Sequence, residues 1–466
     1  MRAPLALAFV LLAAGCVGAG VDPATVPSPG ASVLAYRDVD GILQALPLPS
    51  SVATVTLHPL GVPTVEPSIA VTSSGALFVA ADEDILRSTD DGATWERVQS
   101  YAKARDVPGV GNVPFTLDPW VWADAATDRV FTDHLTLACT TVAWSDDDGD
   151  TWSPDWPLAC GTPLTDFQKL VTGPPGPEPN PKAGAAFGSV VYLCYNKVVP
   201  GFVAARYGLA CAASYDGGRV WENEHLLSQS VWVGEQEVVQ GCMGGAWIPA
   251  VAPDGTVVIR SQPGCMFRTR DSGASWQQVG TGPDFQGTIF SFDDAGTLYA
   301  LSAWWDPPLR VSVSRDQGET WETPFLVQPP GAHAPMFPTL VAGAAGKLFI
   351  PLWATSEEIA SGFDSSDDTV WHAWLVAVEG ADTDAPTSVA YRATPDGAPM
   401  HIGHAARGMG SFFLGDFVTA AIGPDGTPYV VFPQTCNERC QGKEDPGRRD
   451  LEQLGTVVAL RGWAMR

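Results

Sequence analysis

Positively charged residues are scarce in this chain. Only 26 of its 466 residues are Lys or Arg, against 52 Asp or Glu, so the formal net charge is −26. A surface with this surplus of carboxylates repels nucleic-acid phosphates and anionic lipid headgroups. The composition therefore argues against nucleic-acid binding, and an anionic sugar would need a pocket that concentrates arginines.

The chain also lacks any long amphipathic helix pattern. Its 40 prolines and 48 glycines suit many short strands and turns, and 45% hydrophobic residues are enough to build a core. These features predict an all-β protein.

One short turn pattern recurs five times in the first 320 residues. The copies are Ser88-x-Asp90-x-Gly92-x-Thr94-Trp95, Ser145-x-Asp147-x-Gly149-x-Thr151-Trp152, Ser214-x-Asp216-x-Gly218-x-Val220-Trp221, Thr269-x-Asp271-x-Gly273-x-Ser275-Trp276 and Ser314-x-Asp316-x-Gly318-x-Thr320-Trp321. The Asp can bond backbone N–H groups across the turn, and the Gly supplies a positive φ. The Trp opens the next strand, and we expect it to be largely buried between sheets. Five copies indicate a repeat architecture of four-stranded units.

This pattern resembles the Asp box, or BNR repeat, of the sialidase-like β-propellers. The resemblance spans about residues 60–460 and implies antiparallel four-stranded blades, with the Asp boxes on the face opposite a ligand site. It implies no particular reaction, because sialidases, sortilin-type receptors, xyloglucan hydrolases and photosystem-assembly propellers all carry the pattern.

A second repeat indicates the number of blades. A small-residue turn followed by alternating apolar residues occurs at 74–78, 127–131, 188–192, 254–258, 295–299, 345–349 and 425–429. We therefore predict seven blades, with six as the alternative because sialidases proper have six. The last unit runs out of chain before a fourth strand, so residues 52–58 are expected to pair with it and close the ring.

The N-terminus predicts export. Residues 3–14 are apolar and read as a signal peptide, and the segment ending at Cys16 resembles a lipobox in which that cysteine is lipidated. The alternative is ordinary cleavage nearby, for instance after Ala19. We divide the chain into a signal peptide (1–16), a tether with an N-terminal extension (17–50) and a propeller (51–466). The predicted location is extracytoplasmic, at the cell surface or in the periplasm, with a lipid anchor.

Nine cysteines leave eight when Cys16 is set aside, which in an exported chain allows four disulfides. The blade register predicts the pairs Cys139–Cys160, Cys194–Cys211, Cys242–Cys265 and Cys436–Cys440. The sequence offers no CxxC pair and no His at ligand spacing from a Cys, so we predict no zinc site and no cofactor.

The innermost strands of a propeller start around one end of its axis, which is the default ligand site. The first strand of each unit gives the candidate pocket residues Glu66, Asp118, Trp120, Asp166, Gln168, His333 and Asp416, with Trp122 and Lys169 beside them. The alternative interpretation is that these groups satisfy inner-strand backbone around a water-filled channel.

The residues of sialidase catalysis do not appear. Exo-sialidases need three arginines around the substrate carboxylate and a Tyr/Glu nucleophile pair, but the strand that should carry the first Arg reads Val65-Glu66-Pro67-Ser68-Ile69. We therefore predict a monomeric, membrane-anchored interaction module that binds a glycan or a protein at its axial mouth. The alternatives are a glycoside hydrolase of the exo-α-sialidase type and an assembly-factor propeller.

Overall fold

The computed structural model describes residues 33–64, 66–81, 84–100, 105–107, 111–113, 117–135, 140–158, 165–199, 206–233, 236–239, 242, 248–261, 265–280, 288–302, 308–405, 417–434 and 454–466. Within them, one short 3-10 helix, η1 (Gly362–Asp364), accompanies 35 β-strands. No helix in this part of the chain is long and apolar enough to span a membrane. The fold is all-β, as predicted.

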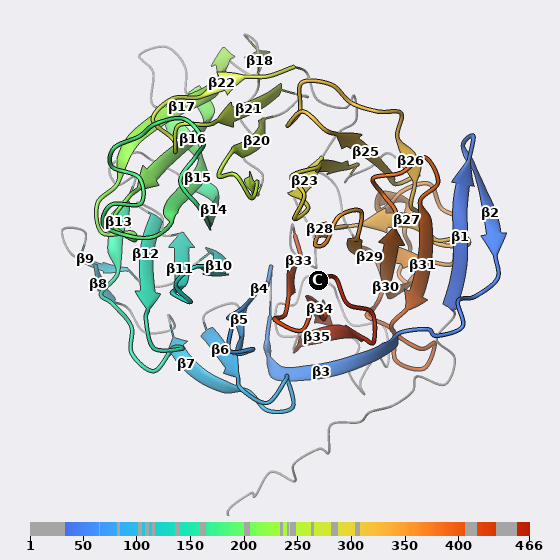
Figure 1. Ribbon diagram of the computed structural model, residues 1–466. Helices are drawn as coiled ribbons and strands as arrows, with labels where there is room; N and C mark the ends of the chain where they lie inside the picture. The colour runs from blue at the N-terminus through green and yellow to red at the C-terminus, as the bar shows by residue number, and fades with distance from the viewer. Residues whose placement is uncertain are drawn as a thin grey trace, which may run out of the picture.

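The described strands form seven sheets of four or more strands around a common axis, together with a peripheral two-stranded ribbon (Figure 1). We number the seven sheets as blades 1 to 7 in the chain order of their innermost strands. Blades 1, 2, 4 and 5 are plain four-stranded antiparallel meanders. Their strands are β4 (Ser68–Val71), β5 (Leu77–Ala81), β6 (Asp84–Ser88) and β7 (Glu96–Ser100); β10 (Leu117–Ala123), β11 (Val130–Leu135), β12 (Thr140–Ser145) and β13 (Trp156–Leu158); β19 (Ala250–Val251), β20 (Val257–Ser261), β21 (Cys265–Thr269) and β22 (Gln277–Gln278); and β23 (Ile289–Phe292), β24 (Leu298–Leu301), β25 (Arg310–Ser314) and β26 (Phe325–Leu326).

The other sheets carry additions. Blade 3 has five strands, blade 6 has eight, and blade 7 combines the two ends of the chain. Their strands are β14 (Thr165–Gly173), β15 (Val190–Val199), β16 (Arg206–Ser214), β17 (Glu222–Val233) and β18 (Gln236–Val239); β27 (His333–Met336), β28 (Val341–Ala342), β29 (Leu348–Thr355), β30 (Val370–Glu379), β31 (Thr387–Arg392), β32 (His401–Ile402), β1 (Val33–Val39) and β2 (Ile42–Leu46); and β33 (Thr419–Ile422), β34 (Pro428–Gln434), β35 (Leu454–Arg461) and β3 (Thr54–Pro63). The peripheral ribbon is β8 (Arg105–Val107) with β9 (Gly111–Val113).

The predicted ring closure is confirmed. Strand β3 lies at the outer edge of blade 7 and pairs antiparallel with β35, with Thr54 opposite Arg461. It supplies the fourth strand that the C-terminal part of the chain lacks. Closing the ring between the two ends of the chain removes an open sheet edge.

A hairpin of β1 and β2 extends blade 6, which the sequence did not indicate. Strand β1 pairs with β31, and Tyr36 of β1 is completely buried. Its hydroxyl donates to the carbonyl oxygen of Val327 beyond β26 of blade 5, at 2.7 Å. The N-terminal extension therefore packs on the propeller from Val33 onward, and the tether before it lies outside the described residues.

The Asp boxes are turns held by their own side chains. In the first, Asp90 accepts bonds from the Thr94 N–H (2.8 Å) and the Thr94 hydroxyl (2.6 Å), while the Ser88 hydroxyl accepts from the Gly92 N–H (2.9 Å). The hydroxyl bond from Thr94 is the main cause that keeps the pKa of Asp90 below its usual value. The other four boxes repeat the bond from the residue before Trp to the Asp carboxylate.

The Asp boxes share a face with the first hairpin of each blade, as predicted. The Ser74 hydroxyl in the first hairpin of blade 1 donates to Asp148 of the second box, and Gln317 of the fifth box donates to Asp254 in the first hairpin of blade 4. We call this the Asp-box face. Because strands alternate in direction, the innermost strands begin at the opposite face.

The Asp-box tryptophans are half-buried, not largely buried as expected. Each packs one side of its ring on an apolar cluster, as Trp321 does where it stacks on Phe290 with ring centroids 5.9 Å apart. The other side of the ring stays open because the Trp follows an exposed turn at the rim. The apolar core is otherwise divided among interfaces between neighbouring blades, such as the cluster joining Phe78 of blade 1 to Val130 of blade 2.

Two of the predicted disulfides are confirmed. Cys194–Cys211 joins β15 to β16 with Cα atoms 4.1 Å apart, and Cys242–Cys265 has Cα atoms 5.7 Å apart. The pairs Cys139–Cys160 and Cys436–Cys440, and the lipidation candidate Cys16, lie outside the described residues.

Candidate functional site

The predicted mouth is built by an unusual backbone conformation that recurs at the start of the innermost strands. Glu66, Asp118, Phe167 and Ala334 have φ values of 50°, 48°, 53° and 46° in blades 1, 2, 3 and 6. The pairing register of β10, β14 and β27 shifts where these residues lie. A left-handed conformation costs a residue other than glycine about 1–2 kcal/mol, and such strain often collects at functional sites.

Asp118 and Gln168, two predicted site residues, are brought together between blades 2 and 3. The Asp118 carboxylate accepts a bond from the Phe167 N–H at 3.0 Å, and the Gln168 amide donates to the Asp118 carbonyl at 2.7 Å. These bonds fasten the bulge of blade 3 to that of blade 2. Part of the predicted pocket therefore stabilises the mouth itself.

Lys169 is completely buried, although it is one of only six lysines in the chain. Its ammonium donates to the Gln168 carbonyl at 3.0 Å and lies 4.1 Å, 4.2 Å and 5.1 Å from the ring centroids of Phe417, Phe167 and Trp120. The Trp120 indole donates to the Leu170 carbonyl at 2.7 Å. The three rings and the ammonium, which we call the lysine cage, join blades 2, 3 and 7 near the axis.

Asp133 of β11 is a buried carboxyl that the sequence reasoning missed. It is completely buried, and desolvation raises its pKa well above the usual range, while the ammonium of Lys169 lowers it and the Asp118 carboxylate raises it. The available signal was the successive polar residues Thr132, Asp133 and His134 within Val130–Leu135, all of which is buried. A strand polar at two successive positions breaks the alternation expected of a half-exposed sheet.

The remaining candidates lie around the mouth without forming one cluster. Glu66 is half-buried two residues before β4 of blade 1, Asp166 is exposed opposite Asn196 of β15, and His333 is half-buried opposite Thr355 of β29. Asp416 lies outside the described residues, directly before the caged Phe417. Trp120 belongs to the lysine cage, so its ring is 2% exposed rather than open to a ligand.

The described mouth thus presents carboxylates to solvent and shields its lysine. Among the described residues, no group of three or more His, Cys, Asp or Glu side chains could hold a metal ion. Carboxylates beside a backbone held by cross-blade bonds can accept hydrogen bonds from sugar hydroxyls or pair with basic side chains.

Residues 121–350 match the family described as a BNR repeat-like domain. No curated protein sequence matches the chain. Similar solved structures include a protein of unknown function from Dyadobacter fermentans (12% identity, TM-score 0.42, covering 88% of this chain and 98% of that one) and the K499G mutant of NanB sialidase from Streptococcus pneumoniae (11%, 0.40, 90% and 87%). Another is an α-L-arabinofuranosidase mutant from Fusarium graminearum (12%, 0.38, 73% and 97%). Four of the five Asp-box turns lie within the matched segment, so the family match and the fold together identify this chain as a BNR-type β-propeller similar to the sialidases.

Proposed function

We propose that this chain is an exported binding module that takes a neutral or positively charged ligand, a glycan or a basic protein segment, at the mouth. The observation that supports this most is the burial of Lys169. Its ammonium is enclosed by three rings and is not exposed, so it is not available to clamp a substrate carboxylate. Sialidase chemistry requires cations in contact with that carboxylate.

Charge supports the same choice of ligand. The partly exposed carboxyls of Glu66 and Asp118 and the exposed Asp166 lie on a protein of formal net charge −26. Such a field speeds the approach of cationic ligands and slows that of anionic ones. The cross-blade bonds of Asp118 hold the mouth in one geometry, which reduces the entropy lost when a ligand binds.

The raised pKa of Asp133 favours the glycosidase alternative, but the burial of this residue counts against a catalytic role. A carboxyl with a raised pKa is the usual mark of a general acid, and Asp133 has such a pKa. However, Asp133 is completely buried on β11, where a substrate cannot touch it. The exposed Asp166 is the better candidate for chemistry on a bound sugar.

The test combines binding with turnover. We expect the purified protein to bind neutral glycans on an array, or basic peptides, and the affinity for basic peptides should fall at high salt. Asp166→Asn and Glu66→Gln should each weaken that binding, whereas Asp384→Asn, an exposed acid in the β30–β31 turn, should not. A panel of fluorogenic glycosides that includes sialosides should give no turnover. Turnover abolished by Asp166→Asn or Asp416→Asn would overturn the proposal in favour of a glycosidase.

We further propose that the protein is held at the membrane by a lipid on Cys16. The disulfides support an oxidising, extracytoplasmic environment, and the lipobox-like segment supports the anchor. Palmitate labelling of cells that express the full chain should mark the wild type and not Cys16→Ser. Unlabelled wild type that is released into the medium would instead show ordinary signal cleavage.

A further inference from the structure

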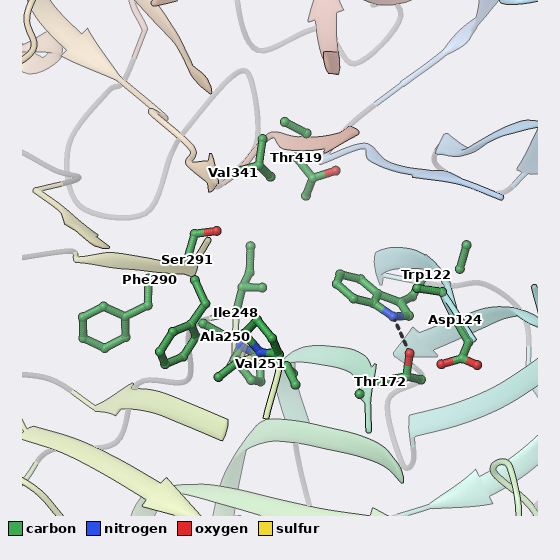
Figure 2. A pocket seen from close by; sticks show the side chains of 18 of the residues that line it. Trp122, Asp124, Thr172, Ile248, Ala250, Val251, Phe290, Ser291, Val341 and Thr419 are labelled. Atoms are coloured by element: carbon green, nitrogen blue, oxygen red, sulfur yellow. Dashed lines mark hydrogen bonds between the residues drawn. The ribbon is translucent and has the colours of Figure 1, made fainter. Parts of the chain in front are cut away.

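A cavity of about 460 Å³ lies on the axis at the Asp-box face, opposite the mouth (Figure 2). The innermost strands of all seven blades line it, with Ile69, Trp122, Thr172, Val251, Ser291, Val341 and Thr419 among the wall residues. Most of these residues lie at or near the ends of their strands, next to the first hairpins. The volume is in the range of about 300–1,000 Å³ that is typical of small-molecule sites.

The wall is mainly apolar and includes the aromatic residues Trp120, Trp122, Phe290 and Phe292. Ile248, Ala250, Val251 and Val341 contribute aliphatic surface, and Trp122 lies across the cavity from them (Figure 2). The Trp122 indole N–H is already satisfied, because it donates to the Thr172 hydroxyl at 2.9 Å. The half-buried ring can therefore contact an apolar or aromatic ligand without leaving a polar group unpaired.

Five Ser and Thr residues line the cavity, and the hydroxyls of three of them have defined bonding partners. Each already accepts a bond from an N–H: Thr172 from Trp122, Ser291 from Ala342 (3.0 Å) and Thr419 from Ile69 (2.8 Å). A hydroxyl that accepts such a bond still has its own proton to donate. The cavity thus offers O–H donors within apolar surroundings, which suits oxygen acceptors on a ligand.

The charged groups of the wall disfavour an anion. No Lys or Arg is among the described residues that line the cavity. Asp124 accepts bonds from the N–H and hydroxyl of Thr127, and Asp293 accepts from the Thr297 N–H and the Tyr299 hydroxyl. These two carboxylates are thereby held in their own hairpins, and the third, that of Asp294, is exposed to solvent.

We propose that this axial cavity is a second binding site, for an uncharged small molecule with an apolar or aromatic body and an oxygen acceptor. None of the acidic residues of the mouth, Glu66, Asp118 and Asp166, lines this cavity. Trp120 of the lysine cage borders this cavity, although it is only 2% exposed.

The test uses two fluorescent naphthalenes that differ in charge. Prodan is neutral and has a ketone acceptor, whereas 1-anilinonaphthalene-8-sulfonate is anionic. We expect saturable 1:1 binding of prodan with a blue-shifted emission, and at least tenfold weaker binding of the sulfonate. Val341→Trp fills the cavity and should weaken prodan binding at least tenfold. Val220→Trp, the same change at a residue that is 54% exposed on the rim, should not.

A second, smaller substitution in the cavity controls for the case in which Val341→Trp fails to fold. Ala420→Leu, from another part of the wall, should also weaken prodan binding, and thermal unfolding will report whether each variant is folded. Asp166→Asn at the mouth should leave prodan binding unchanged, so a failure here is separate from a failure of the mouth proposal. The cavity proposal is overturned if prodan does not bind, if neither filling variant weakens binding, or if the sulfonate binds equally well.

Discussion

The ammonium of Lys169 lies 4.1 Å from the centroid of the Phe417 ring, although the two residues belong to blades that are far apart along the chain. Lys169 is on the innermost strand of blade 3, and Phe417 lies two residues before that of blade 7. A cation over an aromatic face stabilises the fold by about 0.5–2 kcal/mol, and the value is at the upper end where water is excluded. The contact therefore links the first half of the propeller to its last blade beside the mouth.

Removing the charge of Lys169 should destabilise the propeller. Lys169→Met keeps most of the side-chain volume in the cage but removes the cation from three aromatic rings, so the free energy of unfolding should fall by about 2 kcal/mol. Urea titration of the wild type and the variant measures this. Lys182→Met removes a lysine paired with Glu222 on the surface and should have no measurable effect.

Lys169 and Asp133 should also be energetically coupled, because the ammonium of Lys169 lowers the pKa of the Asp133 carboxyl. The double variant Lys169→Met/Asp133→Leu removes the cation and the carboxyl together, so it should be less destabilised than the sum of the two single variants. Strictly additive losses would show that the charges of Lys169 and Asp133 do not interact.

Asp133 should also make stability depend on pH. Burial raises its pKa in the folded protein, whereas in the unfolded chain an Asp titrates at about 3.9. Between these two pKa values the folded state keeps a proton that the unfolded state has lost, so the free energy of unfolding falls as pH rises. Asp133→Asn removes this dependence. Its melting temperature relative to wild type should therefore be higher at pH 7.5 than at pH 4.0.

An exposed acid provides the control for this pH dependence. Asp384→Asn should show the same difference from wild type at both pH values, because its carboxyl is exposed in the folded protein. If Asp133→Asn behaves like Asp384→Asn, then Asp133 does not have the raised pKa that its burial implies.

The features of the fold that could be predicted from sequence are those set by local chemistry. The bonds of Asp90 to Thr94 lie within one turn, so the motif alone predicts them. Pairing of β3 with β35 could be predicted because a blade with three strands needs a fourth. The β1–β2 hairpin was missed because its register depends on β31, a strand more than 300 residues later, and nothing in residues 33–46 specifies that partner.

The candidate site could be predicted by position but not by exposure. Counting strands correctly placed Asp118 and Gln168 at the start of the innermost strands, where they bond across two blades. The burial of Lys169 was not predictable in this way, because Phe417, one of the rings that cover it, comes from another blade. The axial cavity was also missed, since small apolar residues such as Ala250 and Val251 resemble ordinary core residues in sequence.

Two equivalent hairpin glycines should differ in their tolerance of alanine. Gly255 and Gly296 occupy the same position in blades 4 and 5, with φ of +84° and +83°. A Cβ on Gly255 would lie 2.4 Å from the Pro175 carbonyl oxygen, whereas one on Gly296 would meet nothing within 4 Å. Gly296→Ala should cost about 1–2 kcal/mol of backbone strain alone. Gly255→Ala should cost about 1–3 kcal/mol more, because the segment at Pro175 must move.

Chemical denaturation of the two single variants measures this difference. Equal losses for Gly255→Ala and Gly296→Ala would mean that the segment at Pro175 does not rest on the blade 4 hairpin as the structure has it.

The C-terminal residues should stabilise the two blades that lack Asp boxes. Met465 is completely buried, its N–H donates to the Gly426 carbonyl of blade 7 at 2.9 Å, and its carbonyl accepts from the Ala344 N–H of blade 6. The tail thus joins the first hairpins of blades 6 and 7 on the Asp-box face. Met465→Ala should lower the free energy of unfolding by about 2–5 kcal/mol, the usual cost of emptying a buried Met site.

Two truncated chains distinguish the loss of the Met465 contacts from a general effect of shortening the chain. Deleting residues 463–466 should lower the melting temperature at least as much as Met465→Ala, because it also removes the bond from the Trp463 indole to Glu379 (3.0 Å) and the one from Lys347 to the Ala464 carbonyl (2.7 Å). Deleting the exposed Arg466 alone should change the melting temperature little. Equal melting temperatures for the two truncated chains would contradict a stabilising role for the tail. In that case strand pairing between β3 and β35 would be sufficient to hold blade 7 in the ring.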